Sequence, residues 1–168
     1  LPYDHKLSAS QAHQVQCERD GSVILNKKNL RSFTDQLEYP LHFLDFETTQ
    51  MAVPEFAVQR PYQQIPFQYS LHIQDSKNSD ILHYEFLAES ENTEPRINFI
   101  NSLIHDCGNN GSILVYNIGF EKSILNQLIK DFPKYESQLQ AIIDRMLDLM
   151  VPFQKKHYYT PEMKGSYS

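Results

Sequence analysis

The sequence predicts an α/β domain whose mixed sheet combines an antiparallel meander of three strands with one parallel strand and is flanked by helices. Three segments with strand periodicity follow one another with only loops between them. A helical pattern, a short apolar strand and two more helical patterns come next, in the order that adds a parallel strand to an existing sheet. The chain has 168 residues, 40% of them hydrophobic, which is enough for one domain with a core.

We expect residues 1–22 to be an extended or poorly ordered lead-in, because they show no clear hydrophobic period. A helical pattern from Asn29 to Leu37 follows, and Pro40 ends it. We therefore divide the chain into a lead-in segment with a short helix, residues 1–38, and an α/β domain, residues 39–168. Because the first residue is not Met, we expect the chain to be part of a longer protein.

The three strands of the meander are predicted from their apolar residues. Residues 41–46 are almost entirely apolar. The segment 48–64 has no period and contains two prolines, so we expect a long loop there, and loops of that length are often functional. Apolar residues alternate with polar ones at 67–73, and apolar residues recur at every second position of 82–86, which predicts two half-buried strands.

The second half of the chain alternates helices with a strand. Pro95 suits the first turn of the helical pattern that follows it. Residues 113–116 form a short apolar segment, typical of a strand that is buried in parallel pairing. Helical patterns follow at 120–128 and 139–146, whereas the aromatic and basic residues 152–168 have no period.

Composition excludes several classes of protein. No apolar run approaches the length of a membrane span, and no signal peptide opens the chain. Cys17 and Cys107 are isolated, without the spacing of metal ligands, and two lone cysteines suit a reducing, cytoplasmic setting. The net charge of −6 argues against a purely electrostatic nucleic-acid binder but is compatible with a metal-dependent nuclease, in which cations offset clustered acids.

The most informative feature is the pair Asp45 and Glu47, which follows the apolar strand of residues 41–46. Side chains alternate faces along a strand, so both carboxylates point the same way and Phe46 points the other way. Two like charges raise each other's pKa unless a cation lies between them, and divalent cations prefer carboxylate oxygens. The alternative is an exposed strand end with solvated acids, because Asp-x-Glu is a short and common pattern.

A second acid, Glu121, lies in the first turn of a predicted helix, after a strand that ends near Tyr116 and a turn at Asn117 and Gly119. Acids stabilise helix N-termini by roughly 0.3–1 kcal/mol, and that alone explains its position. If the two apolar strands are neighbours, however, Asp45, Glu47 and Glu121 meet at one end of the sheet.

These segments resemble the ribonuclease-H-like 3′–5′ exonuclease superfamily of the proofreading type. That superfamily opens with Asp-x-Glu at the end of its first strand, as in Phe43–Thr48. Its second motif is Asn, a short spacer and Phe-Asp at a helix start, as in Asn117–Glu121, where Glu121 stands in place of the usual Asp. Glu is longer by one methylene, so this departure bears on the geometry of metal binding.

The sequence resembles more closely an uncharacterised bacterial family within that superfamily, the domain of unknown function 2779, in which Glu at the second motif is usual. The resemblance covers roughly residues 38–168. It is carried by four segments: Pro40–Thr48, Pro61–His72, Tyr116–Lys122 and Gly165–Ser168. Similar proteins often carry a second nuclease-like domain, and we expect one elsewhere in the full-length chain.

The resemblance implies a two-metal site for Mg²⁺ or Mn²⁺, with Asp45 bridging both ions and Glu47 and Glu121 holding one each. It implies supporting roles for Asn117 and Asp148, although an acid at a helix end or a strand start explains Asp148 equally well. The superfamily takes a fourth acid and a general base from a later helix. We therefore expect the exonuclease-like domain of residues 39–168 to be incomplete at its C-terminus.

The predicted reaction is hydrolysis of phosphodiester bonds in DNA or RNA, with single-stranded nucleic acid as the expected partner. Arg60 and Tyr62, in the long loop, are candidates for substrate contacts. Lys155–Tyr159 mixes basic and aromatic residues as a single-strand platform would, and a solvated loop is the alternative. A catalytically inactive nucleic-acid-binding or interaction module is the second hypothesis. A two-carboxylate hydrolase with another substrate is the third, and it ranks last because the two acids are too close together.

Overall fold

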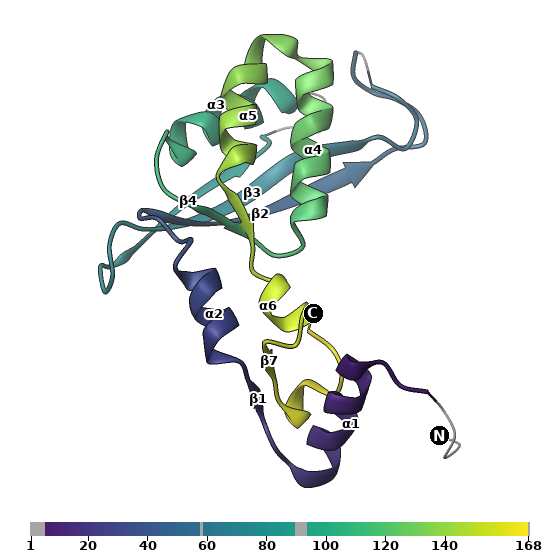
Figure 1. Ribbon diagram of the computed structural model, residues 1–168. Coiled ribbons are helices and arrows are strands. Elements are labelled where there is room, and N and C mark those ends of the chain that lie inside the picture. Colours follow the sequence, from purple (N-terminus) through teal and green to yellow (C-terminus); the bar gives the residue numbers. More distant parts are fainter. Residues whose placement is uncertain (1–5, 58, 90–93, 168) are drawn as a thin grey trace. The chain divides into compact units, whose positions relative to one another are not determined.

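The computed structural model describes residues 6–57, 59–89 and 94–167 (Figure 1). The chain forms two compact units. The larger unit is Glu38–Asp148, and the smaller unit combines Leu1–Leu37 with Leu149–Ser168. In the described part of the chain, no helix has both the length and the apolar character needed to cross a membrane.

The larger unit is built on a five-stranded mixed sheet. Its strands are β2 (Leu41–Gln50), β3 (Gln64–Gln74), β4 (Ile81–Leu87), β5 (Ile113–Val115) and β6 (Met146–Asp148). The spatial order is β4-β3-β2-β5-β6, in which β2, β3 and β4 pair antiparallel and β5 pairs parallel with both β2 and β6. The predicted meander and the predicted parallel strand are therefore confirmed.

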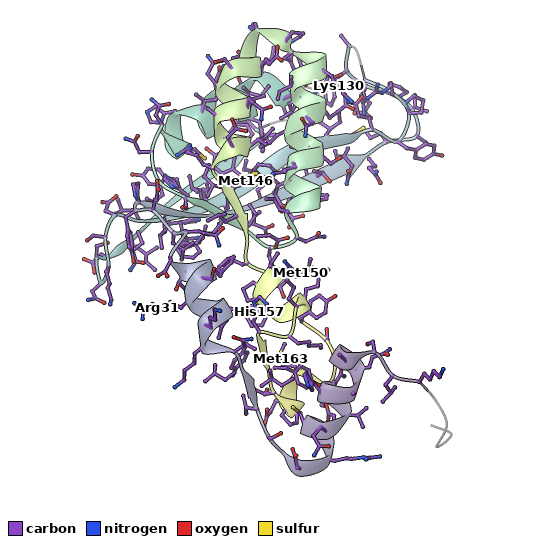
Figure 2. All side chains as sticks on the ribbon, viewed as in Figure 1. Arg31, Lys130, Met146, Met150, His157 and Met163 are labelled. Carbon is purple, nitrogen blue, oxygen red and sulfur yellow. The ribbon has the colours of Figure 1, made fainter. Side chains whose placement is uncertain are left out.

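Two strand predictions need correction. Strand β2 continues to Gln50, so the prediction of a loop from residue 48 was wrong, and β3 begins as early as Gln64. Residues 48–50 are polar and show no apolar run, but they pair with residues 64–66 beyond a β-bulge after Glu47. Met146 was predicted in a helix, yet it begins β6, where α5 has ended (Figure 2). A strand of three residues is too short to show a period.

Three helices cover one face of this sheet (Figure 1). They are α3 (Arg96–Cys107), α4 (Ile118–Asp131) and α5 (Glu136–Asp144), and a short 3₁₀ turn, η1 (Pro133–Tyr135), precedes α5. Their apolar faces pack against the sheet in one core that includes Leu44, Phe46, Tyr69, Phe99 and Leu125. Burial of each such side chain stabilises the folded state by about 1.5–3 kcal/mol. Most of the apolar positions that predicted these helices face the core.

In the smaller unit, the prediction of an extended lead-in was wrong. Helix α1 spans Ala9–Asp20. Ser8 and Gln11 form a reciprocal capping box at its start, and Gly21 ends it with a φ of 68°. Of the residues in α1 whose burial is described, Cys17 alone is fully buried, so the helix has little apolar face and its caps are the main local signal.

The two termini of the described chain fold together in the smaller unit. Its other elements are β1 (Ile24–Leu25), α2 (Lys27–Thr34), α6 (Val151–Gln154), β7 (Tyr158–Tyr159) and η2 (Pro161–Met163). Strands β1 and β7 pair antiparallel. The buried Tyr159 hydroxyl donates to Glu18 at 2.6 Å and accepts from the Gly165 amide at 3.0 Å. Segments far apart in sequence therefore build one small unit, although residues 152–168 show no period.

Candidate functional site

The acid pair on β2 lies on the face of the sheet opposite the helices. Leu44 and Phe46 are each 3% exposed and belong to the core, whereas Asp45 and Glu47 are exposed. The prediction that both acids share one face is therefore confirmed. They do not lie at the strand end as expected, because β2 runs on to Gln50. Instead they follow the point where the parallel ladder between β2 and β5 stops, at Phe43 and Leu114.

Glu121 lies in the first turn of α4, where it is 2% exposed. Its Oε2 atom is buried and has no hydrogen-bond partner among the described residues. The pKa of this carboxyl is raised to about 7, mainly by burial and in smaller part by the charges of Asp45 and Asp148. The fold thus brings Glu121 within electrostatic reach of two other acids, one from β2 and one from β6.

Asp148 positions the start of α4. Its Oδ1 atom accepts from the Asn117 amide at 3.1 Å, and its Oδ2 atom accepts from the Ile118 amide at 3.3 Å. A carboxylate at this place satisfies two amides that the helix itself leaves unpaired. Asn117 adopts a left-handed conformation with a φ of 69°, and its side chain makes no capping bond. The supporting contact therefore comes from β6, and it holds the turn that presents Glu121.

The geometry does not show a preformed metal centre. Within the part of the chain that the structure describes, no three acidic, histidine or cysteine side chains lie close enough together to hold a metal ion as they stand. The expected convergence of Asp45, Glu47 and Glu121 on one cation is therefore not present in these side-chain positions. The donor chemistry still suits Mg²⁺ or Mn²⁺, because all three donors are carboxylates and a buried oxygen of Glu121 lacks a partner.

Arg60 and Tyr62 line a cavity of about 270 Å³ between their loop and α4. The described lining is mostly polar and consists of Gln50, Arg60, Pro61, Tyr62, Gln63, Gln64, Ser123, Ile124 and Gln127. The Arg60 guanidinium donates to Gln127, and the Tyr62 side chain is 69% exposed. None of the described lining residues is one of the three predicted acids. The structure therefore places Arg60 and Tyr62 at the same cavity, whose described lining does not include Glu121.

A buried charge network that the sequence analysis missed holds this loop. Arg96 is fully buried and forms ion pairs with Glu94 at 2.6 Å and Asp131 at 2.9 Å. It also donates to the carbonyl of Ala57 at 2.8 Å, and Asp131 accepts from Gln63 at 2.6 Å. The network ties the loop to the start of α3 and the end of α4. No local pattern could reveal the whole network, because Asp131 and Ala57 lie 35 and 39 residues from Arg96 in the sequence.

Comparison with known proteins gives one match. The model of a family described as Domain of unknown function (DUF2779) matches residues 42–168, a range that contains all the candidate site residues. No curated protein and no solved structure matches the chain.

Proposed function

The chain belongs to the DUF2779 family, and we propose that its larger unit is a metal-dependent nuclease domain of the ribonuclease-H-like 3′–5′ exonuclease type. The arrangement of the sheet supports this proposal, since the antiparallel meander β4-β3-β2 continues into the two parallel strands β5 and β6. The placement of two acids on β2 and a third at the start of the helix that follows β5 supports it as well.

The single observation that carries the proposal is the buried Oε2 atom of Glu121, which has no hydrogen-bond partner among the described residues. A buried polar atom without a partner costs about 1–3 kcal/mol, and more when it is charged. Such a cost is explained if the oxygen serves a ligand that satisfies it. The nearby charges of Asp45 and Asp148 make a cation the fitting ligand, because each additional anion attracts it further.

In this proposal, Asp45, Glu47 and Glu121 hold Mg²⁺ or Mn²⁺, in the two-metal arrangement expected of a complete domain. The bound cations would supply Lewis acidity and a nucleophilic water for phosphodiester hydrolysis. Asp45 and Glu47 are exposed, so their carboxylates are accessible to a cation from solvent. Asp148 keeps the start of α4 in place, and Arg60 and Tyr62 would contact the phosphate and a base of a single strand.

A second function deserves a test because of one specific observation. The carboxylates are not grouped tightly enough to hold a metal as they stand in the described residues. This favours a catalytically inactive domain that binds nucleic acid or another protein beside a separate nuclease domain.

The deciding experiment is digestion of labelled single-stranded DNA and RNA by the protein with Mn²⁺. We expect Asp45→Asn and Glu121→Gln each to lower the rate by more than about a hundredfold, beyond the usual loss for residues that only support metal ligands. Glu85→Gln is the matched control, because Glu85 is an exposed acid on β4 of the same sheet. If the wild type digests a substrate and Asp45→Asn digests it equally fast, the proposed site is refuted. No digestion with either substrate would favour the inactive module.

A further inference from the structure

The smaller unit concentrates positive charge in two segments. Residues 21–34 and 149–161 contain five lysines and arginines and no aspartate or glutamate, in a chain whose net charge is −6. The five cations are Lys27, Lys28, Arg31, Lys155 and Lys156. We name these residues the basic cluster. In the sequence its two halves are separated by more than a hundred residues, so the cluster exists only in the folded chain.

Pairing of β1 with β7 brings the two halves together. Leu25 lies opposite Tyr158, and the amide of Asn26 donates to the carbonyl of His157 at 2.8 Å. Lys27 and Lys28 directly follow Asn26, whereas Lys155 and Lys156 directly precede His157. Helices α2 and α6 are also in contact. Figure 2 marks the two sides of the cluster with Arg31 on α2 and His157 after α6.

The basic residues on α2 contribute little to the stability of their own unit. Lys27 and Lys28 lie in the first turn of α2, where cations oppose the helix dipole and where no acid is present. Within the described ranges, only Arg31 has an acidic partner, Asp35 at 3.9 Å, and both side chains are largely exposed. Lysines gathered without counter-charges repel one another. A surface that keeps such repulsion is expected to have an anionic partner.

The cluster also presents aromatic rings. The Lys156 ammonium lies 4.3 Å from the centre of the Tyr159 ring and 5.8 Å from that of Tyr167, which orders its long side chain. Tyr158 is 36% exposed, and its ring packs edge-on against Phe153. Cations that alternate with an exposed ring suit a single-stranded nucleic acid, since phosphates meet the lysines and a base can stack on the ring.

We infer that the smaller unit is a docking surface for single-stranded nucleic acid, with the basic cluster contacting the phosphates and Tyr158 stacking on a base. That the polyanion is a nucleic acid rests on the function proposed above. That the surface is positive follows from the sequence and the pairing of β1 with β7 alone. Binding through this surface requires no metal. Cleavage by the larger unit and binding by the smaller unit can therefore fail separately.

The test is equilibrium binding of a fluorescently labelled oligothymidine to the protein in EDTA at several salt concentrations. Five phosphate contacts predict that the logarithm of the binding constant falls with that of salt with a slope of about −3.5, or about a hundredfold between 50 and 200 mM. The double variant Lys27→Ala with Lys28→Ala should bind more weakly and reduce this fall to about twentyfold. If that variant does not fold, the double variant Arg31→Ala with Lys155→Ala replaces it, and the same weakening and the same reduced salt dependence are expected.

Lys77→Ala with Lys130→Ala is the matched control, because it removes the same charge from exposed lysines of the larger unit. The inference would be overturned if the control weakened binding as much as Lys27→Ala with Lys28→Ala does. Absence of binding in EDTA would overturn it as well. Binding to vesicles of anionic phospholipid without binding to the oligonucleotide would overturn it in favour of a membrane. Asp45→Asn should bind like the wild type, whatever its effect on cleavage.

Discussion

The two units of this protein carry opposite charge. The larger unit has seven lysines and arginines against sixteen aspartates and glutamates, a net charge of −9, whereas the smaller unit has eight against five, a net charge of +3. The net charge of −6 for the whole chain hides this separation. The larger unit carries the negative charge that argues against a purely electrostatic nucleic-acid binder. The smaller unit, by contrast, has a positive charge, which nucleic acid attracts.

The units also differ in how deeply their charges lie. In the larger unit Arg96 and Glu121 are buried. Arg96 forms ion pairs, whereas the Glu121 Oε2 atom has no hydrogen-bond partner in the described part of the chain. In the smaller unit Lys27, Lys28 and Arg31 are exposed. Buried charges should therefore affect folding stability and its pH dependence, and exposed charges should affect binding and its salt dependence.

The largest effect is expected for the paired buried charge. Arg96→Met leaves Glu94 and Asp131 without their cation, and we expect it to lower the free energy of unfolding by about 3–5 kcal/mol. Urea unfolding measures this loss. Arg31→Met is the control in the smaller unit, and its exposed pair with Asp35 should contribute less than about 1 kcal/mol. Equal losses in the two variants would remove the contrast between buried and exposed charge.

Removal of the buried Glu121 carboxyl should increase stability at high pH, whereas removal of Arg96 should decrease it. The folded pKa of Glu121 is raised from 4.5 to about 7, so its protonated form stabilises the fold at low pH. In EDTA that stability should be lost as the pH rises from about 4.5 to about 7, by about 1.4 kcal/mol per pH unit. Glu121→Gln should therefore be more stable than the wild type at pH 8, by up to about 3 kcal/mol.

Thermal melts of the wild type and Glu121→Gln across this pH range provide the measurement. Glu136→Gln is the control, because Glu136 is an exposed acid in the first turn of α5. A wild type whose stability rises through the same pH window would show that Glu121 has a partner when ionised.

A smaller effect is expected where a charge only caps a helix. Asp148→Ala removes the acceptor for the Asn117 and Ile118 amides, and we expect a loss of about 1 kcal/mol. Asp144→Ala, which removes an exposed acid bonded only to Gln140 among the described residues, should change stability by less than about 0.5 kcal/mol. Chemical denaturation compares the two. If Asp148→Ala proves neutral, α4 does not depend on β6 for its start.

The smallest effect on stability is expected in the basic cluster. Lys27→Ala with Lys28→Ala should leave the melting temperature unchanged or raise it slightly, because it relieves repulsion and an unfavourable helix-dipole contact. Calorimetry at low and high salt checks this expectation, since added salt should remove the difference between variant and wild type. A clear loss of stability would show that these lysines hold the smaller unit together.

The sequence by itself determined the elements whose pattern is local. Strand alternation placed Asp45 and Glu47 on one face, and helical periodicity located α3, α4 and α5, because burial on one side of an element leaves a repeat in its own residues. The same reasoning missed α1, which has little apolar face, and β6, which is too short to repeat. The capping box marks the start of α1, and pairing with β5 defines β6, so neither element leaves a hydrophobic repeat in its own residues.

Only the tertiary structure decided which distant residues meet. Parallel pairing of β5 with β2 brings Glu121 within electrostatic reach of Asp45, and pairing of β5 with β6 aims Asp148 at the start of α4. Pairing of β1 with β7 gathers the basic cluster from both ends of the chain. Strand partners and their register depend on how whole faces bury one another, and a single segment carries no record of its neighbour. For that reason the acids could be proposed from the sequence, whereas the burial of Glu121 and the positive surface became visible only in the fold.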